Sequence, residues 1–206
     1  MAIKAVIFDL DGTITQPYFD FDAIREEIGL DRNSGPVLEA MEKMTPAERL
    51  NAQKILHYHE RKALEESRLN DSAKETIFRL REMGILVGIL TRNTKENAFS
   101  IARMHGLHFD AVVGREEGPV KPDAFGVLHL CKTFGVRPQE TLVVGDYLFD
   151  LQCARSAGAI AVLLANHKKA EEFVENADYR IERNIEVIDI IESEKQRLVK
   201  GNSNVY

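Results

Sequence analysis

The sequence contains no long apolar segment and little cysteine. Its longest apolar runs, such as residues 159–165, are far too short to span a bilayer, and no basic region followed by a long apolar stretch opens the chain. The two cysteines, Cys131 and Cys153, are too few for a disulfide framework, and their apolar helical surroundings are typical of buried free thiols. These absences exclude a membrane-spanning or disulfide-stapled chain, and we expect a cytoplasmic protein.

Basic residues are outnumbered by acidic ones. The chain has 27 Lys and Arg residues and 33 Asp and Glu residues, which gives a formal net charge of −6. This balance argues against general binding to nucleic acid or to an anionic membrane. A small anionic ligand is still compatible, because a local cation and a lysine can outweigh the global field. The sequence also lacks a cysteine cluster, which argues against a zinc site. It contains no long apolar heptad seam, so we expect a monomer.

The chain does contain a regular alternation of strand-like and helical patterns. Short apolar runs that suit strands buried on both faces occur at residues 5–8, 85–90, 111–113, 141–144 and 159–164. Amphipathic helical patterns lie between the later runs, at residues 72–83, 94–105, 123–134 and 149–157. This alternation predicts an α/β fold with a doubly wound parallel sheet and helices on both faces.

Residues 16–70 interrupt this alternation. They contain no convincing strand, but helical patterns occur at residues 21–28, 36–44 and about 45–67, the last one opened by a capping box with Pro46. A helical block of this size is too long for a simple connection. We interpret it as a helical cap inserted into a core of residues 1–15 and 71–206. The alternative is a structural extension packed rigidly on the sheet.

Two acidic residues, Asp9 and Asp11, directly follow the first apolar run. In open α/β sheets, ligands bind just beyond the carboxyl ends of the strands. Repulsion between the two carboxylates costs free energy unless a cation or a proton offsets it. The pair is therefore either a cation site or an ordinary pair of turn and helix-capping acids.

Polar residues follow two further runs in the same way. Thr91, Arg92 and Asn93 follow the second run and lead into a helix, where a hydroxyl, an amide and backbone N–H groups can bind an anion. The alternative there is an ordinary helix cap. The fourth run ends on Asp146, and Asp150 follows four residues later, a spacing that can place both acids on one side of a turn into a helix.

Lys121 lies before Pro122, which biases the lysine to an extended backbone. A lysine fixed near several aspartates could offset their charge and that of a phosphate, although a solvated surface lysine is the common alternative. Converging carboxylates favour Mg²⁺, which takes oxygen ligands and tolerates bound phosphate and water.

These motifs together resemble those of the haloacid dehalogenase superfamily of phosphohydrolases. The matching residues are Asp-Leu-Asp-Gly-Thr at 9–13, Thr91, Lys121, Asp146 and Asp150, in order over most of the chain. The insert looks like the small helical cap of the phosphoglycolate phosphatase and β-phosphoglucomutase branch. The resemblance implies a Rossmann-like core and a Mg²⁺-dependent phosphatase for a small phosphorylated metabolite.

The resemblance also implies a role for each residue. Asp9 would be the nucleophile that forms an aspartyl-phosphate, and Asp11 would act first as general acid and then as base. Mg²⁺ would be bound by the Asp9 carboxylate, the Asp11 backbone carbonyl and Asp146. Lys121 would stabilise the charge of the phosphoryl group and of Asp9, and Asp150 would orient Lys121 or a metal-bound water.

The phosphoryl group would be held by Thr91 and by backbone N–H groups nearby. We expect Lys121, Arg92 and Asn93 to be further phosphate ligands, although Arg92 could instead face solvent.

Three other functions are compatible with parts of this pattern. A phosphomutase of the β-phosphoglucomutase type is the closest alternative, since charged cap residues could hold a bisphosphate. A dehalogenase is disfavoured, because a halide leaving group needs no proton from Asp11. A protein that binds a phosphorylated metabolite without catalysis is more distant, because both Asp9 and Asp11 are present.

Overall fold

A computed structural model describes residues 2–202 of the chain. Within this part, six parallel strands pair in the order β3-β2-β1-β4-β5-β6. The strands are β1 (Ala5–Phe8), β2 (Leu86–Leu90), β3 (Ala111–Val113), β4 (Thr141–Gly145), β5 (Ile160–Leu164) and β6 (Tyr179–Ile181). The predicted doubly wound parallel sheet is therefore confirmed. The strand order reverses between β1 and β4, which is where such sheets bind ligands.

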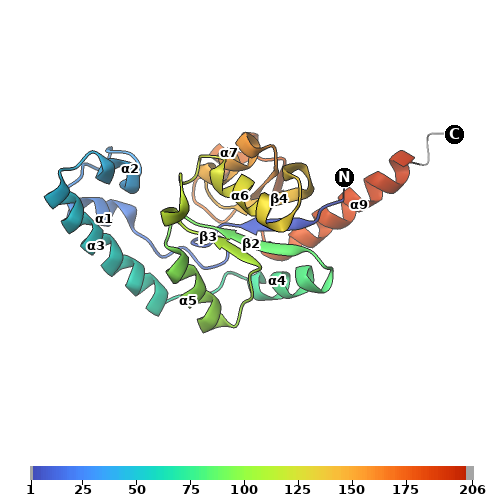
Figure 1. The fold of residues 1–206 in the computed structure, drawn as a ribbon, viewed down its shortest axis with the longest axis horizontal. Coiled ribbons are helices and arrows are strands. Elements are labelled where there is room, and N and C mark those ends of the chain that lie inside the picture. The colour runs from blue at the N-terminus through green and yellow to red at the C-terminus, as the bar shows by residue number, and fades with distance from the viewer. Residues whose placement is uncertain (1, 203–206) are drawn as a thin grey trace. The chain divides into compact units, whose positions relative to one another are not determined.

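Strand β1 lies at the centre of the sheet because its residues are apolar without interruption. Ala5 pairs with Leu86 on one side and with Thr141 on the other, and all four residues of β1 are fully buried. Helices α6 (Phe125–Phe134) and α7 (Leu148–Ala157) cover one face, and α4 (Ala73–Glu82) lies on the other (Figure 1). Burial on both faces explains why no alternation of polar and apolar residues marks this strand.

The other α-helices described in the core are α5 (Lys95–His105), α8 (Ala170–Phe173) and α9 (Val187–Asn202). Strand β6 and helices α8 and α9 were absent from the sequence-based expectations. Strand β6 has only three residues, and Arg180 at its centre is exposed, so no apolar run marks it. Among the described helices, none combines the length and the apolar character needed to cross a membrane.

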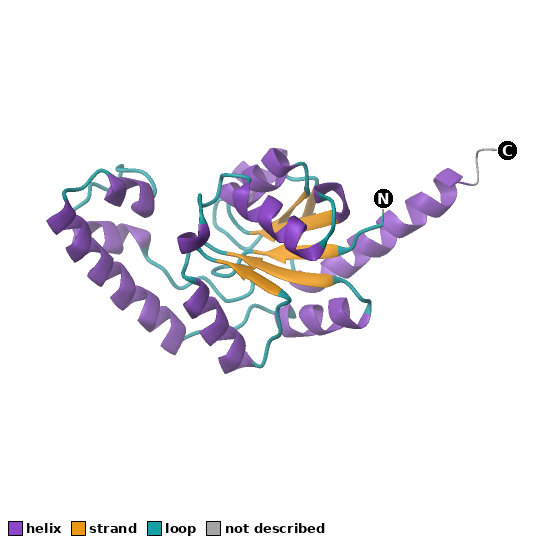
Figure 2. Cartoon of the chain, in the orientation of Figure 1, coloured by secondary structure: helices purple, strands orange, loops and turns teal. Residues whose placement is uncertain are grey.

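Residues Tyr18–Ser67 form a second compact unit, separate from Met1–Pro17 and Arg68–Tyr206. It consists of the helices α1 (Phe21–Ile28), α2 (Val37–Glu42) and α3 (Pro46–Glu65), as Figure 2 shows. The unit has a hydrophobic core of its own, made of Ile24, Val37, Met41, Ala52 and Leu56. That these helices act as a cap stays a prediction.

The capping box predicted at the start of α3 is present. The backbone N–H of Thr45 donates to Oε2 of Glu48 at 2.9 Å, and the backbone N–H of Glu48 donates to the Thr45 hydroxyl at 3.4 Å. Both bonds occupy N–H groups that the first helical turn leaves without partners, so local sequence alone fixes where this helix begins.

The two segments that connect the second unit to the core run side by side. The N–H of Gln16 donates to the carbonyl of Arg68 at 2.8 Å, and Thr15 pairs with Leu69 in an antiparallel bridge. The chain therefore leaves the core and returns to it at one place, directly after the loop that carries Asp9 and Asp11.

Candidate active site

The loop after β1 carries the acidic pair. The N–H of Asp9 donates to the carbonyl of Val144 at 2.9 Å, so the sheet positions this residue. Asp11 precedes Gly12, whose φ of +100° lies in the region that favours glycine. A Cβ at Gly12 would lie 2.5 Å from Oδ2 of Asp146. Glycine is thus required both by the turn and by the close approach of Asp146.

Three asparagine side chains hold the backbone of this loop. The amide of Asn70 donates to the carbonyls of Gly12 at 2.7 Å and Thr13 at 3.0 Å. Asn166 also donates to the Gly12 carbonyl, at 2.6 Å, and Asn184 donates to the Thr13 carbonyl at 2.9 Å. Sequence reasoning missed these residues, because a single asparagine in a loop is usually a turn residue and carries no further signal.

Lys121 lies between two carboxylates. Its ammonium donates to Oδ1 of Asp9 and, at 2.6 Å, to Oδ1 of Asp150, and the side chain is only 4% exposed. Burial opposes the charged ammonium, but the carboxylates of Asp150 and Asp9 outweigh it and raise the pKa of Lys121 above its ordinary value. Lys121 is therefore a permanent cation suited to holding an anion, and it cannot act as a base at neutral pH.

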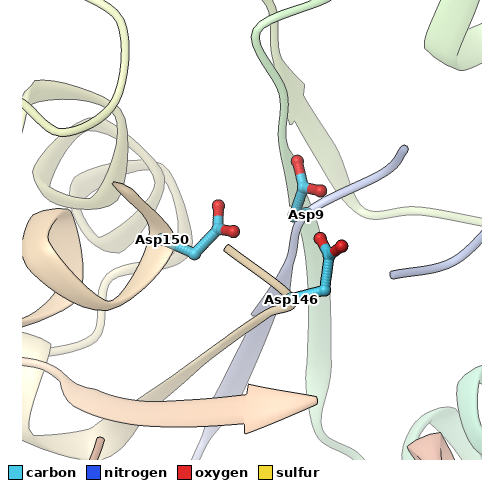
Figure 3. A group of neighbouring side chains, drawn as sticks. All are labelled: Asp9, Asp146 and Asp150. Carbon is cyan, nitrogen blue, oxygen red and sulfur yellow. The ribbon is translucent and has the colours of Figure 1, made fainter. Parts of the chain in front are cut away.

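Three buried carboxylates lie close together beside this lysine. Ligand atoms of Asp9, Asp146 and Asp150 all lie within 4.8 Å of one another. Figure 3 shows the three carboxyl groups gathered at the ends of β1 and β4 and the start of α7. Burial raises the pKa of Asp9 well above its ordinary value, against the opposing effect of Lys121. Burial, followed by the charge of Asp150, raises the pKa of Asp146 to about 7.

The cluster has the composition of a site for a hard cation. It contains carboxylates and no thiol or imidazole among the described residues, which suits Mg²⁺ better than zinc. Asp150 is held by protein donors at both oxygens, since Oδ1 accepts from Lys121 and Oδ2 accepts from the N–H of Tyr147 at 3.1 Å. Asp9 and Asp146 are thus better suited to bind the cation. Burial is the main cause of the raised pKa of each carboxyl group and neighbouring carboxylates add to it, so a bound cation would favour the ionised forms.

Thr91 lies at the end of β2, on the same edge of the sheet. Its hydroxyl oxygen accepts from the N–H of Asn93 at 2.9 Å, and its own N–H donates to the carbonyl of Val113 at 3.0 Å. Because the hydroxyl oxygen accepts, its proton can be donated to an anion. The side chain is 3% exposed, so such a bond would form away from bulk water.

Arg92 and Asn93 lie next to Thr91 but turn to protein partners. The guanidinium of Arg92 lies 5.1 Å from the centroid of the Phe149 ring and donates to the backbone carbonyl of Lys121. The side-chain amide of Asn93 donates to Oδ2 of Asp11 at 3.3 Å. Phosphate binding by Arg92 and Asn93 stays a prediction.

Comparison with known proteins gives a consistent result. A family model described as haloacid dehalogenase-like hydrolase matches residues 3–158. The chain is 32% identical over 200 residues to an uncharacterized hydrolase of Saccharomyces cerevisiae, covering 93% of this chain and 92% of that protein. It is 31% identical over 185 residues to a phosphoglycolate phosphatase of Thiobacillus denitrificans, covering 77% of this chain and 81% of that protein.

A solved structure shares the fold across both units. The crystal structure of a β-phosphoglucomutase from Clostridium difficile matches with a TM-score of 0.75 and 18% identity, covering 96% of this chain and 99% of that chain. At this identity the likeness concerns the fold alone.

Proposed function

The chain belongs to the haloacid dehalogenase-like hydrolases, and on this basis we propose that it is a Mg²⁺-dependent phosphatase of small phosphomonoesters. The observation that carries the proposal is the pair formed by Asp9 and Lys121, with Asp11 two residues away at the same strand end. A carboxylate held by a permanent cation, next to a second carboxyl group, supplies a nucleophile and a proton donor. The phosphatase name of the Thiobacillus relative supports this choice.

In the first step, a carboxylate oxygen of Asp9 attacks phosphorus. The new bond between this oxygen and phosphorus forms as the bond to the ester oxygen breaks, and the ester oxygen takes the proton of the Asp11 carboxyl group. Lys121 and the Thr91 hydroxyl stabilise the charge on the phosphoryl oxygens during this transfer. The products are an aspartyl-phosphate at Asp9 and the free alcohol.

In the second step, water hydrolyses the aspartyl-phosphate. The Asp11 carboxylate takes a proton from the water as its oxygen bonds to phosphorus, and the bond between Asp9 and phosphorus breaks. Inorganic phosphate leaves, Asp9 is again a carboxylate, and Asp11 is again protonated. Asp150 keeps Lys121 in place throughout, through the bond of 2.6 Å described above.

Asp9, Asp146 and the backbone carbonyl of Asp11 are the groups that would hold Mg²⁺. When bound, the ion supplies positive charge that lets an anionic substrate approach an anionic nucleophile. The buried acidic cluster supports this choice of residues and of cation.

Substitution of the proposed nucleophile tests the function. Asp9→Asn keeps the size of the side chain but removes the anionic nucleophile, so we expect phosphate release from p-nitrophenyl phosphate to fall at least about 10³-fold. In the native chain, a chelator should stop release and added Mg²⁺ should restore it. Asp189→Asn changes an exposed acid on α9 and serves as the matched control with native activity.

Retained turnover in Asp9→Asn would contradict the mechanism. A panel of phosphorylated metabolites, analysed for both free phosphate and isomerised product, would separate a phosphatase from a phosphomutase.

A further inference from the structure

We propose that Asn97, acting through Asn93, is a positioning residue that fixes the Asp11 carboxyl group for proton transfer to the leaving group. Its role rests on the proposed phosphatase activity, in which Asp11 protonates the ester oxygen. Asn97 lies in the first turn of α5, outside the motifs that the sequence singled out, and its side chain is buried.

Asn93 connects the proposed acid to the proposed phosphate-binding hydroxyl. Its side-chain NH₂ donates to Oδ2 of Asp11 at 3.3 Å, and its backbone N–H donates to the Thr91 hydroxyl oxygen at 2.9 Å. Its side-chain oxygen accepts from the N–H of Thr94 and from the side-chain NH₂ of Asn97, both at 2.8 Å. One buried residue therefore sets the relative placement of Asp11 and Thr91.

The two donors at the Asn93 oxygen decide which way its amide faces. In the observed orientation, two N–H groups meet the oxygen and the NH₂ group meets a carboxylate. The flipped orientation would turn the oxygen toward an ionised Asp11 carboxylate and the NH₂ group toward the backbone N–H of Thr94, and both contacts would become repulsive. The backbone N–H of Thr94 can only donate and disfavours the flipped state, and the Asn97 NH₂ group adds a second donor that holds the Asn93 amide in the observed orientation.

The position of Asn97 is itself fixed by the helix start. Its backbone N–H donates to the Thr94 hydroxyl at 3.2 Å, the capping bond of α5. The side chain thus reaches Asn93 from a rigid element. A proton donor displaced by about 1 Å from the ester oxygen can lose up to about 10²-fold in rate, so an amide that fixes the carboxyl group affects catalysis without touching substrate.

Two variants of Asn97 separate positioning from stability. Asn97→Ala removes the donor. Asn97→Asp replaces it with an acceptor that repels the Asn93 oxygen, while an acid in the first turn favours the helix. A structural role predicts that both variants lower the free energy of unfolding and affect every substrate equally, whereas a positioning role predicts that both impair catalysis in a way that depends on the leaving group. Thr76→Val removes the hydrogen bond from the buried Thr76 hydroxyl to the Ser72 carbonyl in α4, a helix that carries no proposed site residue, and serves as the stability control.

The readout is the dependence of kcat/KM on the leaving group. A p-nitrophenolate leaving group needs little protonation, whereas an alkoxide depends strongly on the acid. We expect both Asn97 variants to lose about 10–100-fold in kcat/KM for ethyl phosphate and less than about 5-fold for p-nitrophenyl phosphate. Thr76→Val should change both substrates equally or not at all. Equal losses for the two substrates in the Asn97 variants would overturn the proposal.

A crystal structure of Asn97→Asp tests the assignment without turnover. We expect the Asn93 amide to rotate and its contact with Asp11 to be lost, and an unchanged contact would overturn the proposal. If the native chain hydrolyses neither ester, the proposed function fails, and this structural comparison still decides whether Asn97 orients Asn93.

Discussion

Gly12 is the residue on which the spacing between the acidic pair and Asp146 depends most directly. Any side chain there meets the Asp146 carboxyl group, whose Oδ2 would lie 2.5 Å from the added Cβ, and the positive φ adds strain. We expect Gly12→Ala to lower kcat at least about 10-fold, because Asp146 must move, and to destabilise the fold by about 1–3 kcal/mol. Steady-state kinetics and urea unfolding would measure the two effects.

Gly135 offers a matched control for this substitution. It has a similar positive φ of +67° at the end of α6, but an added Cβ would meet nothing within 4 Å. We expect Gly135→Ala to cost about 1 kcal/mol in the free energy of unfolding and to keep native kcat. Native activity in Gly12→Ala would contradict the required approach of Asp146.

The charged residues of the site could be found from sequence, and the neutral ones could not. Acids that directly follow buried apolar runs, such as Asp9 and Asp146, stand out because packing does not explain them. The structure places both beside Lys121, although their chemical roles stay predictions. Asn70 and Asn97 could not be recognised as site residues from sequence. Asn70 bonds to Gly12, a partner distant in sequence, and Asn97 contacts the side-chain oxygen of another asparagine, Asn93, at the site.

Strands β1 and β4 are tied together at their amino ends by Glu140. Its carboxylate lies 3.1 Å from the Arg137 guanidinium and 2.9 Å from the Lys4 ammonium. Hydrogen bonds from Arg137 and then Lys4 lower the pKa of Glu140 to about 2. A lowered pKa in the folded state means that the stabilisation is complete above the ordinary pKa of 4.5 and is lost as the pH falls toward about 2.

We therefore expect Glu140→Gln to be less stable than the native chain at pH 7. The difference in the free energy of unfolding should shrink as the pH falls from about 5 toward 2, because the native carboxylate then becomes protonated. Urea unfolding at a series of pH values measures this difference. Glu192→Gln, at an exposed acid on α9, is the control, and a difference for Glu140→Gln that does not change with pH would refute the ion-pair explanation.

The predicted elements agree with the structure where burial is uniform. Strand β1 has the predicted bounds, and β2 begins one residue later than expected, because apolar runs covered on both faces are visible in sequence. The edge strand β6 was missed because Tyr179 is half-buried and Arg180 is exposed, so its pairing comes from β5 and not from its own apolar residues. Tertiary pairing determines such an element, and local sequence cannot reveal it.

The chain leaves the core before the unit Tyr18–Ser67 and returns to it afterwards at an adjacent point. Because Gln16 bonds to Arg68 at 2.8 Å, a short linker can replace the whole unit without moving either end. We expect a chain in which about four Gly and Ser residues replace 18–67 to fold with a cooperative thermal transition, since each unit has its own hydrophobic core. Circular dichroism and thermal unfolding would measure this.

Removal of α3 alone is the matched control. It would expose Ile24 and Val37, which pack against Ala52 and Leu56 of that helix, so we expect aggregation. A full excision that yields only a non-cooperative, partly folded chain would show that the core depends on the inserted unit.

The two native cysteines make the chain convenient for spectroscopy. Both thiols are buried, and burial raises the pKa of Cys131 and, to about 12, that of Cys153. At neutral pH they are protonated and shielded from thiol reagents. A cysteine introduced on the surface of each unit would thus be the preferred site for a maleimide dye or nitroxide. Paired labels would then report how the distance between the units responds to a phosphate analogue. Cys131 and Cys153 would not have to be replaced first.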